Sequence, residues 1–265
     1  MTQSHYTHGH HESVLRSHRS RTVDNSAAYL IPWLRPGIDV LDIGAGPGTI
    51  TKDFAGRVFP GCVLGIDNAR EIVATATTDA VEVANLSYEV GDAYALPAAD
   101  DTFDIVHAHQ VLQHLAEPVK ALAEWKRVCK PDGVVAARDA DYAVMVWHPA
   151  EPLLDRWLVI YRDVARSNRG EPDAGRRLLE WAHAAGFSDV RASASVWCYS
   201  TPEEREWWGG LWADRLTQSA FGEQAARDGH CSTDDLDEMA AAWHRWSAAP
   251  AGWFAVLHGE IICSP

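Results

Sequence analysis

The chain has 265 residues, and its 47% hydrophobic and 23% charged content is typical of soluble globular proteins. A formal net charge of −14 at pH 7 repels phosphate backbones, which argues against a nucleic-acid partner. No apolar run approaches the roughly 20 residues that span a bilayer, so we expect no membrane partner. Five scattered cysteines and an N-terminus without an apolar leader predict reduced thiols and a cytoplasmic location.

Short β-branched runs alternate with helical patterns after a basic, histidine-rich opening of 36 residues. This alternation predicts βαβ units, and therefore an α/β fold with a mostly parallel sheet and helices on both faces. The five strands of this part are expected at residues 38–43, 62–67, 86–90, 103–108 and 133–138.

The second half of the chain has a less regular pattern. Apolar spacing predicts helices over 150–168 and 173–185, and alternation predicts a strand over 189–200. Helical patterns then fill 202–247, and residues 252–265 alternate as a final strand. We therefore expect one domain with a helical insertion between its last two strands.

A glycine-rich turn follows the first strand, in VLDIGAGPGTIT at residues 40–51. Gly44, Gly46 and Gly48 permit positive φ and let a ligand lie against bare backbone. The helix that follows offers unpaired N–H groups at its start. A dinucleotide fingerprint would have GxGxxG spacing, whereas this turn has GxGxG. The turn alone is a weak indicator, because many α/β proteins contain one for structural reasons.

Two carboxylates stand at the ends of the next two strands. Asp67 ends the second strand in GID, where a carboxylate can accept hydrogen bonds from both hydroxyls of a ribose. Asp92 follows the third strand in GDAYALP, where a carboxylate can accept a hydrogen bond from the exocyclic amine of an adenine. Because ligands of open α/β sheets lie at the carboxyl ends of the strands, the three loops predict one adenosine site.

These motifs resemble those of the class I S-adenosylmethionine-dependent methyltransferases, especially the group that includes the ubiquinone and menaquinone biosynthesis enzymes. VLDIGAGPG, GID, GDAYALPAADDTFDIV and LAEPVKALAEWKRVCKPDGVVAARD match the family's motifs in order, over roughly residues 38–140. The resemblance implies a Rossmann-like seven-stranded sheet with an antiparallel last strand, and S-adenosylmethionine as the cofactor. The cofactor contacts that it implies are Asp42, Gly44, Ala45, Gly46, Asp67, Asn68, Gly91, Asp92 and Ala93.

The family also has N-terminal helices that close over the cofactor, and by resemblance residues 1–36 form such a helical cover. Arg16, Arg19 or Arg21 would then meet the carboxylate of the cofactor or an anionic substrate; the alternative is a solvated basic helix. Tyr6 would place an aromatic face near the sulfonium, since such a face favours a cation.

Histidines cluster in THGHH, residues 7–11, and in HAHQVLQH, residues 107–114. We expect no metal at either, because zinc needs three or four ligands on a fixed scaffold. His109 and His114 are also five residues apart, whereas ligating pairs on one helix stand at i and i+4. In the family's fold the fourth strand ends beside the sulfonium. His109 and Gln110 are therefore expected to contact the cofactor at its junction with the acceptor, with His114 facing the acceptor.

The loop after the fifth strand, ARDADYAVMVWHP, adds Asp141 and His148 to the candidates. Methyl transfer mainly needs alignment and exclusion of water, and it needs a base only if the acceptor loses a proton. Histidine suits that role because its pKa lies near neutrality. The catalytic candidates are His109, His114, His148 and Asp141, and the alternative is that these side chains only shape the wall.

We predict a single domain over 1–265, with a cover at 1–36, a cofactor-binding core at 38–140, and a substrate cap with the last strands at 141–265. Most of the twelve tryptophans follow residue 150, which favours a small, partly apolar or aromatic acceptor under a tryptophan-rich cap. Core packing explains these tryptophans equally well. Methylation of a peptide or protein is an alternative, and so are two other classes of protein: an NAD(P)-dependent oxidoreductase and a non-catalytic binder of an adenosine ligand.

Overall fold

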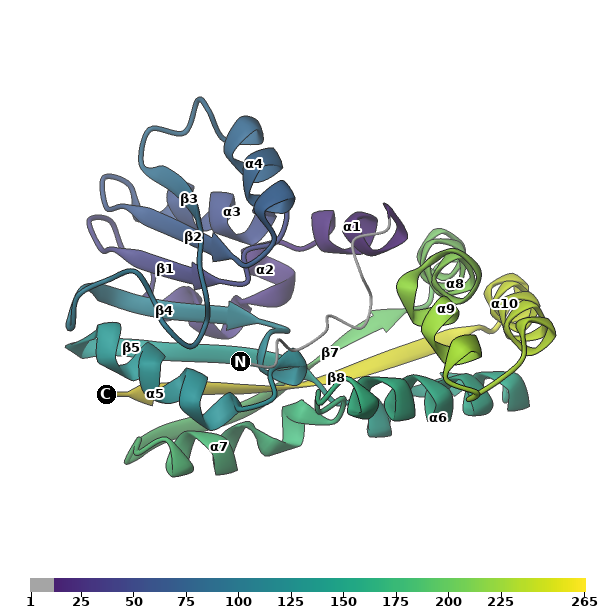
Figure 1. Cartoon of the computed structure of the whole chain (residues 1–265). Helices are drawn as coiled ribbons and strands as arrows, with labels where there is room; N and C mark the ends of the chain where they lie inside the picture. The colour runs from purple at the N-terminus through teal and green to yellow at the C-terminus, as the bar shows by residue number, and fades with distance from the viewer. Residues whose placement is uncertain (1–11) are drawn as a thin grey trace.

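The structure is a computed structural model that describes residues 12–265, and eight strands of this part form one sheet (Figure 1). The strands are β1 Val40–Ile43, β2 Val63–Asp67, β3 Leu86–Val90, β4 Phe103–His109, β5 Cys129–Ala140, β6 Val146–His148, β7 Asp189–Tyr199 and β8 Trp253–Ser264. Their order is β3-β2-β1-β4-β5-β8-β6, and β7 also pairs with β8. Neighbours among β1 to β5 pair in parallel, and β8 is antiparallel to both β5 and β7. The predicted mostly parallel sheet with an antiparallel last strand is thus confirmed, with eight strands in place of the predicted seven.

The helices of the described residues lie on both faces of the sheet and at one end of it (Figure 1). The α-helices are α1 Glu12–Arg19, α2 Val23–Ser26, α3 Thr49–Val58, α4 Arg70–Asp79, α5 Pro118–Val128, α6 Pro152–Ser167, α7 Leu178–Ala184, α8 Pro202–Gln218, α9 Ala220–Arg227 and α10 Thr233–Ala248. The 3-10 helices are η1 Ala28–Trp33, η2 Leu112–His114, η3 Tyr142–Val144 and η4 Ala174–Arg177.

Alternation along the strands divides the core into two layers. Leu41 and Ile43 of β1 belong to the hydrophobic cluster that contains α5 and α7. Val40, one residue earlier, belongs to the cluster that contains η1 and α3 on the opposite face. Successive strand residues point to opposite faces, so a strand buried on both sides is apolar almost throughout. This is why the sequence pattern located β1, β2, β4 and β5, whereas β3 lies at the edge of the sheet and has no buried residue.

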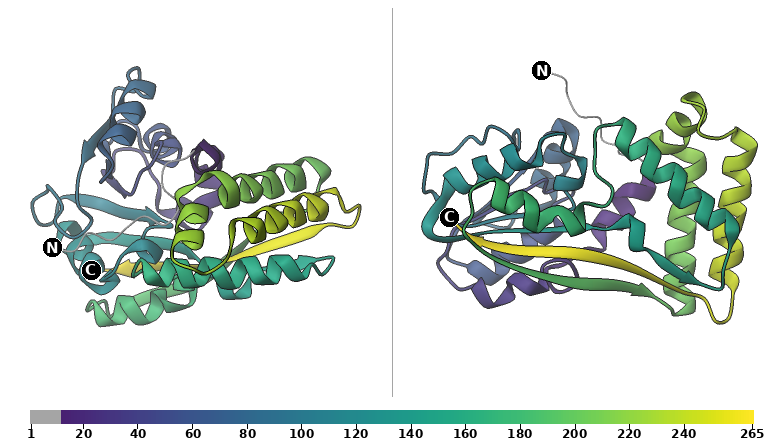
Figure 2. Two further views of the ribbon diagram at one scale, coloured as in Figure 1. Left: turned by 45° about the vertical axis from the view of Figure 1, so that its right-hand side comes forward. Right: turned by 90° about the horizontal axis from the view of Figure 1, so that it is seen from below.

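The helical insertion lies between β7 and β8, as predicted. A capping box of Thr201 with Glu204 begins α8, and one of Ser232 with Asp235 begins α10. Figure 2 shows β7 and β8 running beyond the short strands of the core and out alongside α8 and α10. The two long strands therefore belong to the cofactor-binding sheet at one end and support the inserted helices at the other.

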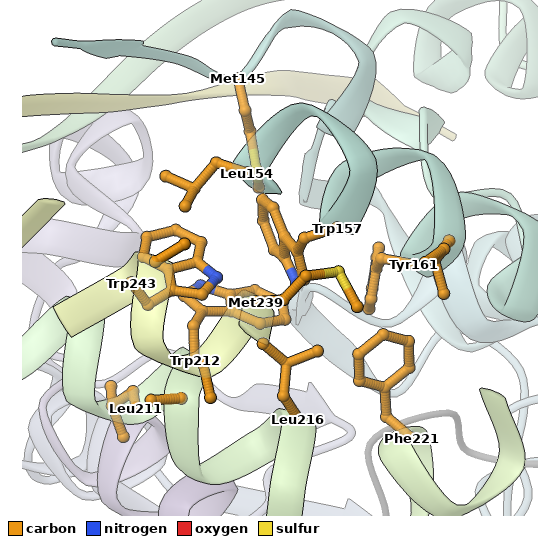
Figure 3. Packing of buried hydrophobic residues seen from close by; sticks show 14 of the residues in the cluster. Met145, Leu154, Trp157, Tyr161, Leu211, Trp212, Leu216, Phe221, Met239 and Trp243 are labelled. Atoms are coloured by element: carbon orange, nitrogen blue, oxygen red, sulfur yellow. The ribbon is translucent and has the colours of Figure 1, made fainter. Parts of the chain in front are cut away.

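Tryptophans of α6, α8 and α10 pack together in the hydrophobic cluster that joins these helices (Figure 3). The ring of Trp157 lies 4.4 Å from that of Trp212 and 4.8 Å from that of Trp243, both edge to face. All three side chains are fully buried in this cluster. For these tryptophans the structure favours core packing over a direct role in a lid.

The sequence does not predict β6, which pairs with residues 253–255 of β8. Three residues are too few to show an alternating pattern, and the pairing joins segments about one hundred residues apart. No helix within residues 12–265 has the length and apolarity that crossing a bilayer requires.

Candidate functional site

A cavity of about 1790 Å³ opens at the carboxyl ends of β1 to β4 and continues beneath α8. Pockets for a single small ligand typically measure about 300–1,000 Å³, so this cavity has room for two ligands side by side. One side of it is lined by the strand-end loops, and the other by α1, α8 and the end of β7.

The glycine turn after β1 has the backbone conformation that its sequence predicts. Gly44, Gly46 and Gly48 have φ of 68°, 56° and 81°, a region that other residues rarely adopt. Gly44, Ala45 and Gly46 line the cavity. A Cβ on Gly46 would lie 3.6 Å from Nδ1 of His18, so a side chain would narrow the space between the turn and α1.

The carboxylate of Asp42 interacts with two side chains of the protein. Its Oδ1 lies 2.7 Å from Nδ1 of His107, and its Oδ2 accepts a hydrogen bond from Oγ1 of Thr51 at 2.6 Å. The carboxylate is buried, and it ties the end of β1 to β4 and α3. Asp42 lines the cavity, but its main contacts are with these two side chains.

The carboxylates after β2 and β3 are more accessible. Asp67 accepts hydrogen bonds from the backbone N–H groups of Gly46 and Ala69, both at 3.0 Å, and it thereby fixes the glycine turn. Asp92 is exposed and accepts one hydrogen bond, from the backbone N–H of Tyr94 at 2.9 Å. Each carboxylate retains lone pairs for a ligand. Both line the cavity together with Asn68, Gly91 and Ala93.

Two of the candidate histidines, His109 and His114, reach the cavity. His109 is 5% exposed, and neither ring nitrogen has a hydrogen-bond partner within residues 12–265. Burial, reinforced by the positive charges of Arg21 and Arg138, lowers its pKa well below the usual value. Burial also lowers the pKa of His114 to about 3, and its Nε2 lies 3.0 Å from Nε2 of Gln113. Both imidazoles are therefore neutral at physiological pH.

Gln110 connects three parts of the chain at the end of β4. It has a left-handed φ of 55°, and its Oε1 accepts a hydrogen bond from Arg21 at 2.6 Å. Its Nε2 lies 3.0 Å from Nε2 of His258 on β8. Nδ1 of His258 lies 3.2 Å from the carbonyl oxygen of Val256, which can only accept. The proton of His258 therefore lies on Nδ1, and Gln110 donates to its Nε2.

A buried ion pair at the cavity was not among the predicted site residues. Arg138 of β5 is 1% exposed and Glu260 of β8 is 6% exposed, and both line the cavity. Nε of Arg138 lies 3.3 Å from Oε1 of Glu260, and its guanidinium lies 4.9 Å from the ring centroid of Trp197. The sequence contains a signal for both residues, because each is a charge inside an apolar strand.

Asp141 and His148 do not line the cavity that the described residues form. Asp141 is buried, and both of its oxygens accept hydrogen bonds from Arg176, at 2.5 and 2.8 Å. His148 is exposed on β6, opposite Trp253 of β8. The loop after β5 turns through η3 and joins the outer end of β8, which carries these residues away from the strand tips. Their expected catalytic role is not supported.

The side of the cavity opposite the strand ends has an aromatic wall. Tyr199 of β7 stacks on Trp208 of α8 with ring centroids 4.3 Å apart, and Trp207 lies beside them. These three residues line the cavity together with Tyr142 and Met145. Trp207 and Trp208 of α8 thus line the cavity, and Trp208 also belongs to the hydrophobic cluster. Trp212 and Trp243 belong to that cluster without lining the cavity.

Two features predicted from the N-terminal segment lie outside the described residues, namely Tyr6 and the stretch THGHH. Of the three N-terminal arginines, Arg21 lines the cavity, and Arg16 forms an ion pair with Asp214 of α8 at 2.7 Å. Among residues 12–265, no group of three or more histidine, cysteine or acidic side chains is placed to hold a metal ion.

A doubly wound sheet with a glycine turn after β1 and carboxylates after β2 and β3, all at one cavity, defines a Rossmann-like enzyme that binds an adenosine cofactor. Residues 41–137 match a family model described as a methyltransferase domain. An uncharacterized methyltransferase of Schizosaccharomyces pombe is 34% identical over 98% of this chain and 96% of its own. The chain belongs to the class I S-adenosylmethionine-dependent methyltransferases.

Other relatives agree with this assignment. The ubiquinone/menaquinone biosynthesis C-methyltransferase of Cupriavidus metallidurans is 31% identical over 59% of this chain and 70% of its own. A solved structure of a Haemonchus contortus phosphoethanolamine N-methyltransferase, bound to S-adenosylhomocysteine, covers 91% of this chain and 52% of that one, with a TM-score of 0.56 and 18% identity. At that identity the structural likeness concerns the fold.

Proposed function

We propose that this methyltransferase acts on a small, partly apolar or aromatic molecule rather than on a nucleic acid or a protein. The observation that carries the proposal is the size of the cavity together with its two different sides. The strand-end side offers bare backbone and carboxylates, whereas the opposite side offers Tyr199, Trp207 and Trp208. An aromatic wall within a cavity favours a compact acceptor with apolar surface.

The cofactor side fits S-adenosylmethionine by the chemistry of its groups. We propose that Asp67 accepts hydrogen bonds from the ribose hydroxyls, and that Asp92 accepts one from the adenine amine, with Asn68, Gly91 and Ala93 beside them. Asp42, Gly44, Ala45, Gly46 and Gln110 would border the methionine part. When bound, the cofactor supplies an electrophilic methyl group on a sulfonium. The residues of this chain hold the acceptor in line with it and keep water out.

His109 and His114 are proposed to position the acceptor. A neutral imidazole offers one N–H donor and one acceptor nitrogen, and His109 has both available in the cavity wall. A lowered pKa makes either histidine a weak base in the free enzyme. Hydrogen bonding to a hydroxyl or amine of the acceptor therefore suits them better than proton removal.

We also propose that residues 1–265 form one functional domain, in which the cover, the core and the cap surround a shared cavity. Its support is that lining residues come from all three, for example His18, Asp67 and Trp207. Release of S-adenosylhomocysteine should be measured with a panel of small aromatic phenols and amines, and with peptides and protein extracts. We expect turnover with small acceptors. Turnover with peptides or proteins alone would refute the proposal.

A further inference from the structure

Four polar or charged residues form a row across four neighbouring strands. His109 of β4 is in register with Arg138 of β5, Arg138 with Glu260 of β8, and Glu260 with Ser193 of β7. Residues in register point to the same face of a sheet. The row therefore crosses one face, from the end of β4 to the far strand, and its first three members line the cavity.

The hydrogen-bonding capacity of Arg138 is incompletely used. Its Nε donates to Ser195 at 3.1 Å and faces Glu260 at 3.3 Å, but its buried Nη1 has no partner among the described residues. Glu260 in turn also accepts hydrogen bonds from the hydroxyls of Ser193 and Ser195. A buried cation with an unsatisfied donor is costly. An additional acceptor group would relieve that cost.

Other positive charges surround the same end of the cavity. Arg21 from the N-terminal segment and Arg215 from α8 line the cavity with Arg138. Burial raises the pKa of the Tyr199 hydroxyl, and these three arginines oppose that rise because they would stabilise a phenolate. Three cations from separate parts of the chain thus act on one point of the wall, in a protein whose net charge is −14.

We propose that this end of the cavity binds a carboxylate of the methyl acceptor, whose apolar body lies along Trp197 and Tyr199. The inference rests on the proposed function, and it narrows the acceptor to a small aromatic or apolar carboxylic acid. Arginine presents N–H groups in a planar fork that matches a carboxylate. Because Glu260 already offsets part of the positive charge, a monoanion suits the site better than a dianionic phosphate.

We expect the carboxylate of the cofactor to lie away from Arg138. The adenosine side lies at β2 and β3, the methionine side lies at the glycine turn of β1, and β4 separates that turn from Arg138 on β5. From Arg138 the row of polar residues continues away from β4, to Glu260 of β8 and Ser193 of β7. A group bound there is therefore on the acceptor's side of the cavity.

Calorimetry with a matched pair of probes tests the inference. The wild-type protein, saturated with S-adenosylhomocysteine, should bind 2-naphthoate at least about tenfold more tightly than 2-naphthamide, which has the same shape without the charge. Arg138→Gln should remove most of that preference while the affinity for S-adenosylhomocysteine stays within about twofold. Arg191→Gln is the matched control, because Arg191 is exposed on β7 and faces the ring of Trp33 outside the cavity.

A second variant covers the case in which Arg138→Gln does not fold. Glu260→Gln removes the negative partner and keeps an oxygen acceptor for the two serines, so naphthoate should bind more tightly than to the wild type. Equal affinities for the two probes, or no binding of either, would overturn the inference. So would a loss of S-adenosylhomocysteine affinity in Arg138→Gln, because the arginine would then hold the cofactor. Carboxylate preference can fail while small neutral acceptors are still methylated, which separates this inference from the proposed function.

Discussion

Asp67 has two roles at the scale of a single residue. Its carboxylate accepts the N–H groups of Gly46 and Ala69, and it also faces the cavity. The same side chain thus holds the glycine turn in its left-handed conformation and presents charge to a ligand. A carboxylate that accepts several N–H groups is fixed in place before any ligand arrives, which reduces the entropy that binding costs.

Replacement of Asp67 should weaken cofactor binding. We expect Asp67→Ala to lose roughly 1.5–3 kcal/mol of S-adenosylhomocysteine affinity for each charged hydrogen bond removed, measured by calorimetry. Asp67→Asn should lose less, because one amide oxygen still accepts. Asp79→Ala is a suitable control, since Asp79 is exposed at the end of α4. Unchanged affinity in Asp67→Ala would contradict the ribose assignment.

His109 leads to a prediction about pH. Because burial and the charges of Arg21 and Arg138 lower its pKa, it stays neutral as the pH falls from 8 to 6. The value of kcat/KM, which reports the free enzyme, should therefore show no protonation step near 6.5 that depends on this residue. His109→Asn should lower kcat/KM by about tenfold or more through lost positioning. It should leave S-adenosylhomocysteine affinity nearly unchanged.

Exposed His244 of α10 gives the matched control, and His244→Asn should have wild-type rates. An acidic limb with a pKa near 6.5 that disappears in His109→Asn would identify His109 as a proton acceptor. That result would contradict the positioning role.

At the scale of elements, the strands of the core were predictable and the path between them was not. β1, β2, β4 and the second part of β5 are largely buried, so their apolar runs stand out within a few residues of their true ends, whereas β3 is an edge strand with no buried residue. The loop after β5 contains no comparable pattern. Its direction depends on η3 and on the pairing of β6 with β8, a contact between distant segments. The sequence places Asp141 and His148 directly after a strand tip and therefore predicts them at the cavity. Because the course of the loop depends on this distant pairing, the prediction was wrong for both residues.

The candidate site divides in the same way. Asp67, Asp92 and the glycine turn follow strand ends, so their shared edge follows from topology alone. Arg138 and Glu260 are charged residues inside apolar strands. A buried charge requires a partner, but the sequence does not show which residue that partner is. Their pairing depends on the antiparallel register of β5 and β8, which the sequence of neither strand specifies.

Among the described residues, two contacts between the N-terminal segment and the insertion differ in burial. Arg16 meets Asp214 at 2.7 Å with both side chains exposed, whereas buried Arg215 donates to Oγ of Ser17 at 2.7 Å. In urea unfolding, Arg16→Ala should lower the free energy of unfolding by less than about 1 kcal/mol. Arg215→Met should lower it by about 1–3 kcal/mol. A larger decrease in the free energy of unfolding for Arg16→Ala than for Arg215→Met would mean that the exposed ion pair contributes more stability than the buried hydrogen bond.

At the scale of the whole molecule, aromatic side chains serve two separate purposes in one helical insertion. Trp243 of α10 is fully buried against Phe254 of β8, with ring centroids 5.5 Å apart. Trp207 of α8 is half-buried at the cavity. The long strands β7 and β8 connect the two regions. We therefore expect stability and acceptor binding to depend on different tryptophans of the same layer.

Paired substitutions should separate these purposes. Trp243→Ala removes a large buried ring and should lower the free energy of unfolding by about 3–5 kcal/mol, as measured by urea denaturation. Trp207→Ala should change stability by less than about 1.5 kcal/mol, because its ring is only partly buried. It should instead weaken binding of 2-naphthoate to the protein saturated with S-adenosylhomocysteine. If Trp207→Ala destabilises the fold as much as Trp243→Ala and leaves probe affinity unchanged, the aromatic wall is part of the core and the acceptor binds elsewhere in the cavity.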